Sequence, residues 1–351
     1  MKLGVAIEDT WDFFHEIYAE FRAYHDVTLF QRRRIKSPVF HARINRYLFN
    51  RDLKRLMMQN DLVFFEWSSH LLAAASHMAK TCKIVTRLHR FELNEWADRV
   101  NWENVDLLIV VAEAKKQEVL ARFPQLKDKV EVVAGAVDSE KFSLIRKTYN
   151  GDIGILCHLT PRKRVYELIL TFYDLLKTHP HLHLHIGGGR HVAYRDYHDA
   201  LHDTVSRLNM QENVTFYGHV DEPKDWYKNV DVIISNGYSE GLQVSPLEAM
   251  STGRLVFSHF WRGADEMLPK EYLYFTNGQL AELLIEYDSA SIDQKESQSK
   301  WMRDRVITLF NIQSKKVEVR KLVESVAAGS YYPSSPIQTT GNYESRISVA
   351  N

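Results

Sequence analysis

Cysteine is scarce in this sequence, with only Cys82 and Cys157 among 351 residues. The two lie in separate apolar runs that read as strands. The sequence therefore predicts neither a disulfide framework nor a cysteine-based zinc site, and we expect two reduced, buried thiols.

An excess of either charge is also lacking, because 45 basic residues balance 45 acidic ones. No global field then favours nucleic acid or a membrane, and any such preference must come from a local patch. Long apolar runs are missing as well. The first residues, MKLGVAIEDTWDFF, read as a strand and a turn rather than a signal peptide, and no later run approaches the length of a membrane span. We therefore expect a cytoplasmic protein.

What is present is a regular alternation of short apolar runs with longer segments of helical periodicity. This is typical of parallel sheets with crossover helices, and the chain is long enough for two such domains. The expected strands of the first half are 2–8, 26–31, 61–67, 83–89, 105–112 and 129–137. Those of the second half are 152–159, 182–188, 214–220, 231–237, 254–260 and 272–275. The pattern predicts two consecutive doubly wound α/β units of the Rossmann type.

The boundary between the units is expected near residue 148. Residues 138–152 change in composition, lose periodicity and contain an Asn-Gly turn signal. We therefore expect an N-terminal domain over 1–147 and a C-terminal domain over 148–328. Residues 329–351, rich in Ser, Tyr, Pro and Thr, are expected to form a polar tail.

Two glutamates follow the expected strand 231–237, and ligands of such sheets bind beyond the carboxyl ends of strands. Glu240 lies in the outgoing loop, and Glu248 lies one turn into a helix that begins near residue 245. A carboxylate at that depth can accept hydrogen bonds from two ribose hydroxyls. Amides at the positive end of the helix dipole can receive a phosphate, here those of Gly241, Leu242, Gln243 and Val244. The spacing alone fits two exposed helix-surface glutamates equally well.

Residues 214–268 resemble the donor-binding region of retaining glycosyltransferases of family 4, which have the GT-B fold. The E-x7-E element of that family is present as Glu240 and Glu248, followed by EAMSTGRLVF, and RGADE resembles the family's glycine-then-glutamate loop. The resemblance implies two Rossmann-like domains that face a central cleft. It also implies that the last helical segments, within 297–325, cross back toward the first domain.

A second element of the resemblance is GILCHLTPRKRVYELI. The family pattern reads glycine, arginine, leucine, three residues, lysine, where the arginine and lysine hold the donor diphosphate. Here Cys157 and His158 replace the glycine and arginine, while Lys163 is retained. Arg162 or Arg164 is expected to supply the charge that His158 lacks.

Three further positions complete the expected site. LHLHIGGGR matches the strand and glycine turn that line the nucleotide cleft, which makes Gly188 a donor-binding residue, and Val220 ends the next expected strand. VTRLHRFELNEW resembles the strand end that carries a histidine near the donor sugar, which is His89 here. Without the resemblance, a partly buried histidine that donates to a backbone carbonyl is the better interpretation of His89.

The resemblance implies retaining transfer from a nucleotide-sugar, UDP- or GDP-linked, to an acceptor that the sequence does not identify. His89 and Glu240 are the expected catalytic residues at the donor sugar, and Glu248 is expected at the ribose. Lys163 and the amides of 241–244 would stabilise the leaving diphosphate, so no metal and no cofactor is expected. In agreement, the sequence contains no Asp-x-Asp element. The loop 7–16 lacks the paired glycines of many members, and we assign no general base.

Two other functions remain open on the sequence. A sugar-nucleotide epimerase of the same fold would turn over the donor without an acceptor. An inactive protein that binds a nucleotide-sugar or a polyanion would show no turnover at all.

Two other patterns have simpler interpretations. Alternate histidines face one side of an expected strand while the residues between them are apolar, which indicates a polar strand face rather than a metal site; they are His179, His181, His183 and His185. Residues 31–51 contain no acidic residue and interleave arginines with aromatics. This segment is either a solvated basic face, with Phe40, Ile44, Tyr47 and Leu48 toward the core, or a surface for anionic lipid or a phosphorylated acceptor. Nucleic acid is not an expected partner.

Overall fold

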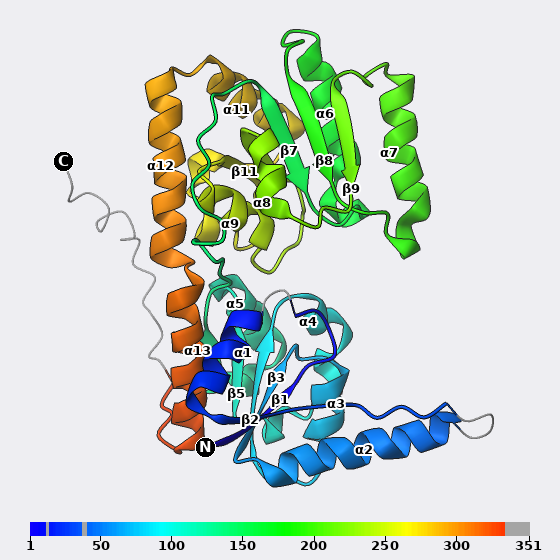
Figure 1. Cartoon of the computed structure of the whole chain (residues 1–351), viewed down its shortest axis with the longest axis vertical. Coiled ribbons are helices and arrows are strands. Elements are labelled where there is room, and N and C mark those ends of the chain that lie inside the picture. The colour runs from blue at the N-terminus through cyan, green and yellow to red at the C-terminus, as the bar shows by residue number, and fades with distance from the viewer. Residues whose placement is uncertain (12–13, 37–40, 334–351) are drawn as a thin grey trace, which may run out of the picture.

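The computed structural model describes residues 1–11, 14–36 and 41–333, and contains two six-stranded parallel sheets. Each sheet belongs to a separate lobe with helices packed against it, and the two lobes lie one above the other (Figure 1). All twelve expected strands are confirmed, as is the expectation of two doubly wound units. Of the expected tail, residues 334–351 lie outside the described residues.

The first sheet has the strand order β2-β1-β3-β4-β5-β6. Its strands are β1 (Lys2–Ala6), β2 (Asp26–Leu29), β3 (Leu62–Glu66), β4 (Lys83–Leu88), β5 (Leu107–Val110) and β6 (Val130–Val132). The helices of this unit are α1 (His15–Tyr24), α2 (His41–Gln59), α3 (His70–Ser76), α4 (Phe91–Glu95) and α5 (Glu113–Arg122). Every residue of β3 is buried, as expected for a central parallel strand with helices on both faces.

The second sheet has the strand order β12-β11-β10-β7-β8-β9. Its strands are β7 (Asp152–Leu156), β8 (His183–Gly187), β9 (Val214–Gly218), β10 (Val232–Ser235), β11 (Leu255–His259) and β12 (Leu273–Tyr274). Its helices are α6 (Val165–Leu176), α7 (Arg195–Arg207), α8 (Pro223–Trp226), α9 (Val244–Ser251), α10 (Ala264–Met267) and α11 (Asn277–Ser289). The order reverses between β7 and β10, which is where doubly wound sheets bind ligands.

Two long helices end the described chain and connect the units along one side of the molecule (Figure 1). Helix α12 (Ile292–Leu309) packs on the second unit, with Met302 and Val306 in its core. Helix α13 (Ile312–Ala327) packs on the first unit beside α1, where Arg320 donates to Glu20 at 3.0 Å. The last described helix therefore packs on the domain where the chain begins.

The histidines of β8 belong to a hydrogen-bonded polar face. His183 contacts the Thr215 hydroxyl at 2.8 Å, and His185 contacts Asp152 at 2.9 Å, while Leu184 and Ile186 are fully buried on the other face. In the described part of the chain, no group of three or more His, Cys, Asp or Glu side chains is arranged to hold a metal ion. Nor does any described helix combine the length and apolar character that crossing a membrane requires.

The apolar residues of the basic segment 31–51 do not all face the core, as the first interpretation of this segment expected. Leu48 is buried, but Tyr47 is 65% exposed and Ile44 lies at the surface, because α2 extends from the body of the first unit as an arm (Figure 1). Phe40 lies outside the described residues.

Candidate functional site

The loops that follow β7 and β10 meet at the reversal point of the second sheet and contain the expected charged residues. Glu240 is only 5% exposed, and its Oε1 atom lies 2.6 Å from Arg162 and 2.8 Å from Lys163. Gln243, at the N-cap of α9, donates to the same oxygen at 3.2 Å. One buried carboxylate oxygen therefore holds two cations at the reversal point of the second sheet.

The backbone decides which arginine joins this cluster. Arg164 has a left-handed conformation, with φ of 52°, and its guanidinium lies near Asn277 and Glu167 instead. Arg162 also donates to the carbonyl of Ser239, which fixes it on the loop that carries Glu240. Of the two arginines left open by the sequence, Arg162 is therefore the one at the site.

Gly237 makes room for the Glu240 side chain. A Cβ atom at position 237 would lie 2.1 Å from Glu240 Oε1, which no side chain tolerates without displacing the carboxylate. The cluster therefore depends on a glycine that precedes the glutamate by three residues.

Glu248 lies one turn into α9, with its Oε2 atom 3.0 Å from the hydroxyl of Tyr227. Tyr227 is fully buried and also contacts the carbonyl of Ser245 at 2.9 Å. Burial and the neighbouring carboxylate raise the pKa of Tyr227 well above its usual value, so the phenol donates a hydrogen bond to Glu248. This contact holds the Glu248 carboxylate in place.

The ends of β7, β8 and β9 bring His158, Gly188 and Val220 together. A Cβ atom on Gly188, whose φ is +151°, would lie 2.0 Å from the carbonyl oxygen of Cys157, and one on Gly187 would lie 3.2 Å from Val220. The backbone after β7 therefore lies in close contact with the glycine turn after β8, and the Val220 side chain packs beside Gly187.

His158 has its pKa lowered by burial and then by the positive charge of Lys163, to which His191, Arg162 and His219 add. The imidazole is therefore neutral at pH 7, and the charge at this end of the sheet comes from Lys163 and Arg162. Burial also raises the pKa of the Cys157 thiol to about 11, which makes it unreactive.

The first unit contributes His89, which follows β4. Its Nε2 atom lies 2.9 Å from the Glu66 carboxylate, and its ring lies against Trp67 with the ring centroids 4.2 Å apart. The backbone amides of His89 and Arg90 both donate to the buried Glu92 carboxylate, at 3.1 and 3.0 Å. The loop that carries His89 is therefore held both through its backbone amides and through the His89 side chain.

The two units contact each other around this loop. Arg90 donates to Ser239 at 3.4 Å, and burial followed by the charge of Arg162 lowers the pKa of Arg90. Farther along, the Glu266 carboxylate of RGADE accepts from the amides of Glu113 and Ala114, at 2.6 and 2.7 Å, and so caps α5 of the other unit. Burial raises the pKa of Glu266, while these amides oppose the rise.

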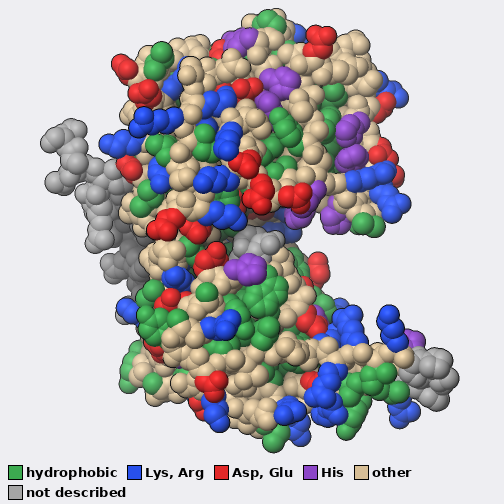
Figure 2. Space-filling model, viewed as in Figure 1, with side chains coloured by type: hydrophobic (Ala, Val, Ile, Leu, Met, Phe, Trp, Pro, Cys, Tyr) green, Lys and Arg blue, Asp and Glu red, His purple; other side chains and the backbone are tan. Residues whose placement is uncertain are grey.

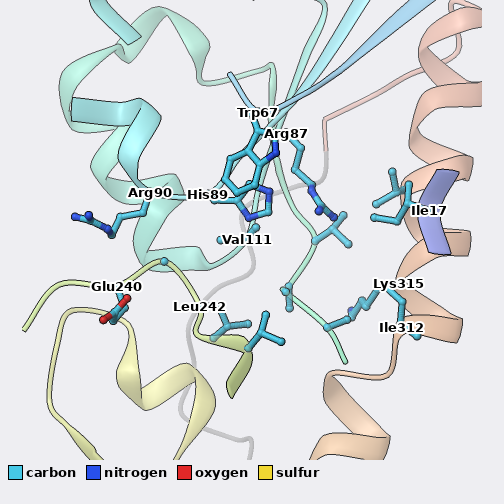
Figure 3. Close-up of a pocket in the computed structure, with 17 residues that line it drawn as sticks. Ile17, Trp67, Arg87, His89, Arg90, Val111, Glu240, Leu242, Ile312 and Lys315 are labelled. Carbon is cyan, nitrogen blue, oxygen red and sulfur yellow. The ribbon is translucent and has the colours of Figure 1, made fainter. Parts of the chain in front are cut away.

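A cavity of about 120 Å³ lies between the units. Trp67, Arg87 and His89 line one side, Glu240 and Leu242 the opposite side, and Ile312 and Lys315 of α13 a third (Figure 3). Charged side chains of both signs lie along the edge of the second unit that faces the hollow between the lobes (Figure 2). Of the candidate residues, His89, Glu240, Gly241, Leu242 and Val244 line this cavity. The others lie outside its lining, namely His158, Arg162, Lys163, Gly188, Val220, Gln243 and Glu248.

Several residues of this region carry no signal in the sequence. Glu66 and Trp67 end an apolar strand and read as part of it, and Arg87 lies within the next strand. Only their arrangement in space brings them to His89. Glu266 belongs to the RGADE loop in the sequence, but its capping contact depends on where α5 lies in space.

Comparison with known proteins finds similar sequences and similar folds. Residues 150–291 match the family model described as Glycosyl transferases group 1. A putative glycosyltransferase of Bacillus subtilis, YtcC, is 27% identical over 191 residues, which cover 48% of this chain and 46% of that protein. An uncharacterised glycosyltransferase of Methanocaldococcus jannaschii is 26% identical over 180 residues, which cover 47% of this chain and 45% of that protein. The chain thus aligns with about half the length of these relatives.

Solved structures match over most of the chain. HepE of Anabaena, described in complex with UDP and glucose, has a TM-score of 0.75 at 15% identity and covers 92% of this chain and 99% of its own. Sucrose-phosphate synthase of Thermosynechococcus elongatus has a TM-score of 0.73 at 15% identity, and the match covers 94% of this chain and 100% of that one. At this identity the likeness is one of fold.

Proposed function

We propose that this chain, which has the GT-B fold and carries a glycosyl transferases group 1 domain in residues 150–291, is a glycosyltransferase that moves a sugar from a nucleotide-sugar donor to an acceptor. The observation that carries the proposal is the contact of Glu240 with Lys163 and Arg162 at the reversal point of the second sheet. This is where a doubly wound sheet binds a nucleotide.

The cluster explains how a donor diphosphate would be bound. Lys163 and Arg162 present hydrogen-bond donors to the Glu240 carboxylate, and phosphate oxygens are equivalent acceptors. The backbone amides of 241–244, at the start of α9, add further donors at the positive end of that helix. On donor binding, the cations would shift toward the diphosphate and leave Glu240 to the hydroxyls of the donor sugar.

The same groups would act in the reaction. When the sugar departs, negative charge develops on the nucleoside diphosphate, and fixed cations and amides stabilise that charge without reorganising. We propose that no divalent metal is needed and that the anomeric configuration is retained. His89 would contact the donor sugar from the first unit, and Glu248, held by Tyr227, would accept from the ribose. Contact between the units would exclude water from the reacting bond.

The first donor to test is a UDP-sugar, because HepE is described in complexes with UDP and with UDP-glucose. The assay measures nucleoside diphosphate release from UDP-, GDP- and ADP-sugars in the presence of EDTA, for the parent and for Glu248→Ala. We expect release from one donor and its loss in the variant. Conversion of the sugar without release would indicate an epimerase, and binding without conversion an inactive binding protein; either result would overturn the proposal.

We further propose that α2 brings the enzyme to an anionic membrane surface, where a lipid-linked or phosphorylated acceptor would be met. Exposed basic residues lie along α2, namely Arg43, Arg46, Arg51, Lys54 and Arg55. Asp52 is the one acidic residue of this helix. Tyr47 and Met58 are exposed beside them, 65% and 62% respectively. An open cavity of about 600 Å³ lies between α2 and the C-terminal end of α3, with Tyr47 and Lys54 in its wall. Positive charge next to exposed apolar side chains is typical of peripheral membrane contact.

A further inference from the structure

Glu66, the last residue of β3, is at the centre of a buried cluster of polar side chains that has no role in the proposed reaction as described above. Its side chain is fully buried. The Oε1 atom accepts from Arg87, at 3.1 Å from Nε and 2.7 Å from the terminal nitrogen, and lies 2.9 Å from Nε2 of His89. The Oε2 atom is buried without a hydrogen-bond partner. A buried carboxylate oxygen without a hydrogen-bond partner is unusual, since buried polar groups are nearly always hydrogen-bonded.

The next residue, Trp67, has a strained backbone. Its φ of 71° lies in the left-handed region, which a bulky aromatic residue rarely adopts. The indole donates to the carbonyl of Thr10 at 3.0 Å and packs against the His89 ring. Such strain persists only where surrounding structure imposes it, and it is concentrated at functional sites.

The strain has a geometric consequence for His89. Consecutive side chains of a strand point to opposite faces, so Glu66 and Trp67 would normally diverge. The left-handed turn at Trp67 instead lets both residues contact the same imidazole, the carboxylate at a ring nitrogen and the indole at the ring face. The first sheet also reverses its strand order here, between β1 and β3.

We propose that Glu66 and Trp67 are positioning residues for His89, an inference that rests on the proposed glycosyl transfer. Glu66 accepts from Nε2–H, which leaves Nδ1 as the accepting nitrogen when the ring carries a single proton. Trp67 sets the plane of the ring. Trp67, Arg87 and His89 line the same side of the interdomain cavity (Figure 3). The pair therefore orients the imidazole toward a hydroxyl group of the donor sugar without contacting substrate itself.

The test is a double-mutant cycle of Glu66→Gln and His89→Ala on sugar transfer. Glutamine keeps the size of Glu66 and removes its charge. We expect each single variant to lower kcat/KM by about 10- to 100-fold, because a small displacement of a positioned group has effects of that order. The double variant is expected to fall no further than His89→Ala alone. Binding of UDP, which lacks the sugar, is expected to stay within about twofold of the parent in all three.

Additive losses in the double variant, or a Glu66→Gln variant as active as the parent, would overturn the inference. A parent that binds UDP but transfers no sugar would overturn the proposed function instead. A second measurement needs neither turnover nor a variant. ¹⁵N NMR of the His89 ring in the parent is expected to show the proton on Nε2, and a proton on Nδ1 alone would contradict the role of Glu66. Trp67→Phe, which keeps an aromatic face, is expected to retain more activity than Trp67→Ala.

Discussion

Gly241 and His89 meet across the two units: a Cβ atom on Gly241 would lie 2.9 Å from the carbonyl oxygen of His89. The E-x7-E loop of the second unit and the histidine loop of the first are therefore in backbone contact. This contact places the two halves of the proposed site at a fixed distance.

Gly241→Ala is expected to separate these loops and lower sugar transfer by about tenfold or more, since misplacement of reacting groups is costly. Thermal stability is expected to fall as well, because the added methyl group meets the backbone of a loop that Glu92 holds in place. Gly278→Ala is the matched control, since its Cβ would meet no atom closer than 3.8 Å in the first turn of α11. Equal activity of the two variants would show that the contact is dispensable.

The variants Glu248→Gln and Tyr227→Phe distinguish the proposed role of Glu248 in nucleotide binding from the role of Tyr227 in holding the Glu248 side chain. Loss of the carboxylate is expected to weaken nucleotide binding about 10- to 100-fold, the effect of removing hydrogen bonds to a charged group. Tyr227→Phe keeps the carboxylate and removes one buried hydroxyl, so it is expected to lower the free energy of unfolding by about 1 kcal/mol. Calorimetric titration and denaturant unfolding measure the two effects. Unchanged nucleotide affinity in Glu248→Gln would exclude the ribose role.

His158 predicts a pH dependence with opposite signs for binding and stability. Its pKa is lowered from 6.5 by burial and by Lys163, so the ring is neutral at pH 7. Protonation would place an additional positive charge beside the proposed diphosphate site, so affinity for UDP-glucose is expected to rise as the pH falls through this lowered pKa. Stability changes the other way, because below pH 6.5 the folded state holds fewer protons than the unfolded state, and acidification favours unfolding.

Titration of UDP-glucose at pH 7.5 and 5.5 tests this, because its diphosphate carries no group that titrates in that range. His158→Gln is expected to abolish the gain in affinity. His179→Gln, which changes a histidine before the start of β8, is expected to keep it. A pH response that survives His158→Gln would assign the effect to another group.

Charge reversal on α2 tests the membrane proposal. Arg46→Glu with Lys54→Glu is expected to reduce sedimentation with vesicles of anionic phospholipid by about tenfold or more, since each basic residue near such a surface contributes about 1 kcal/mol. Lys177→Glu, an exposed position of the second unit, serves as the control. Equal sedimentation with neutral and anionic vesicles would remove the membrane role.

The fold was predictable from local pattern, whereas parts of the site were not. Most strands are apolar runs between turn signals, so all twelve could be located without tertiary information, including the partly exposed β2 and β9. The choice of Arg162 over Arg164 depends on a left-handed φ at a non-glycine residue, for which the sequence carries no signal. Glu66 was hidden because it ends such a run, and its partners come from the neighbouring strand.

Calorimetric titration of UDP-glucose into the parent, Lys163→Ala and Lys177→Ala tests the central claim most directly. Lys163 is 7% exposed and contacts Glu240, while Lys177 is an exposed lysine paired with Asp174. The account predicts binding to the parent and to Lys177→Ala, and affinity lower by about tenfold or more in Lys163→Ala. Equal affinities in all three proteins would contradict a donor site between β7 and β10.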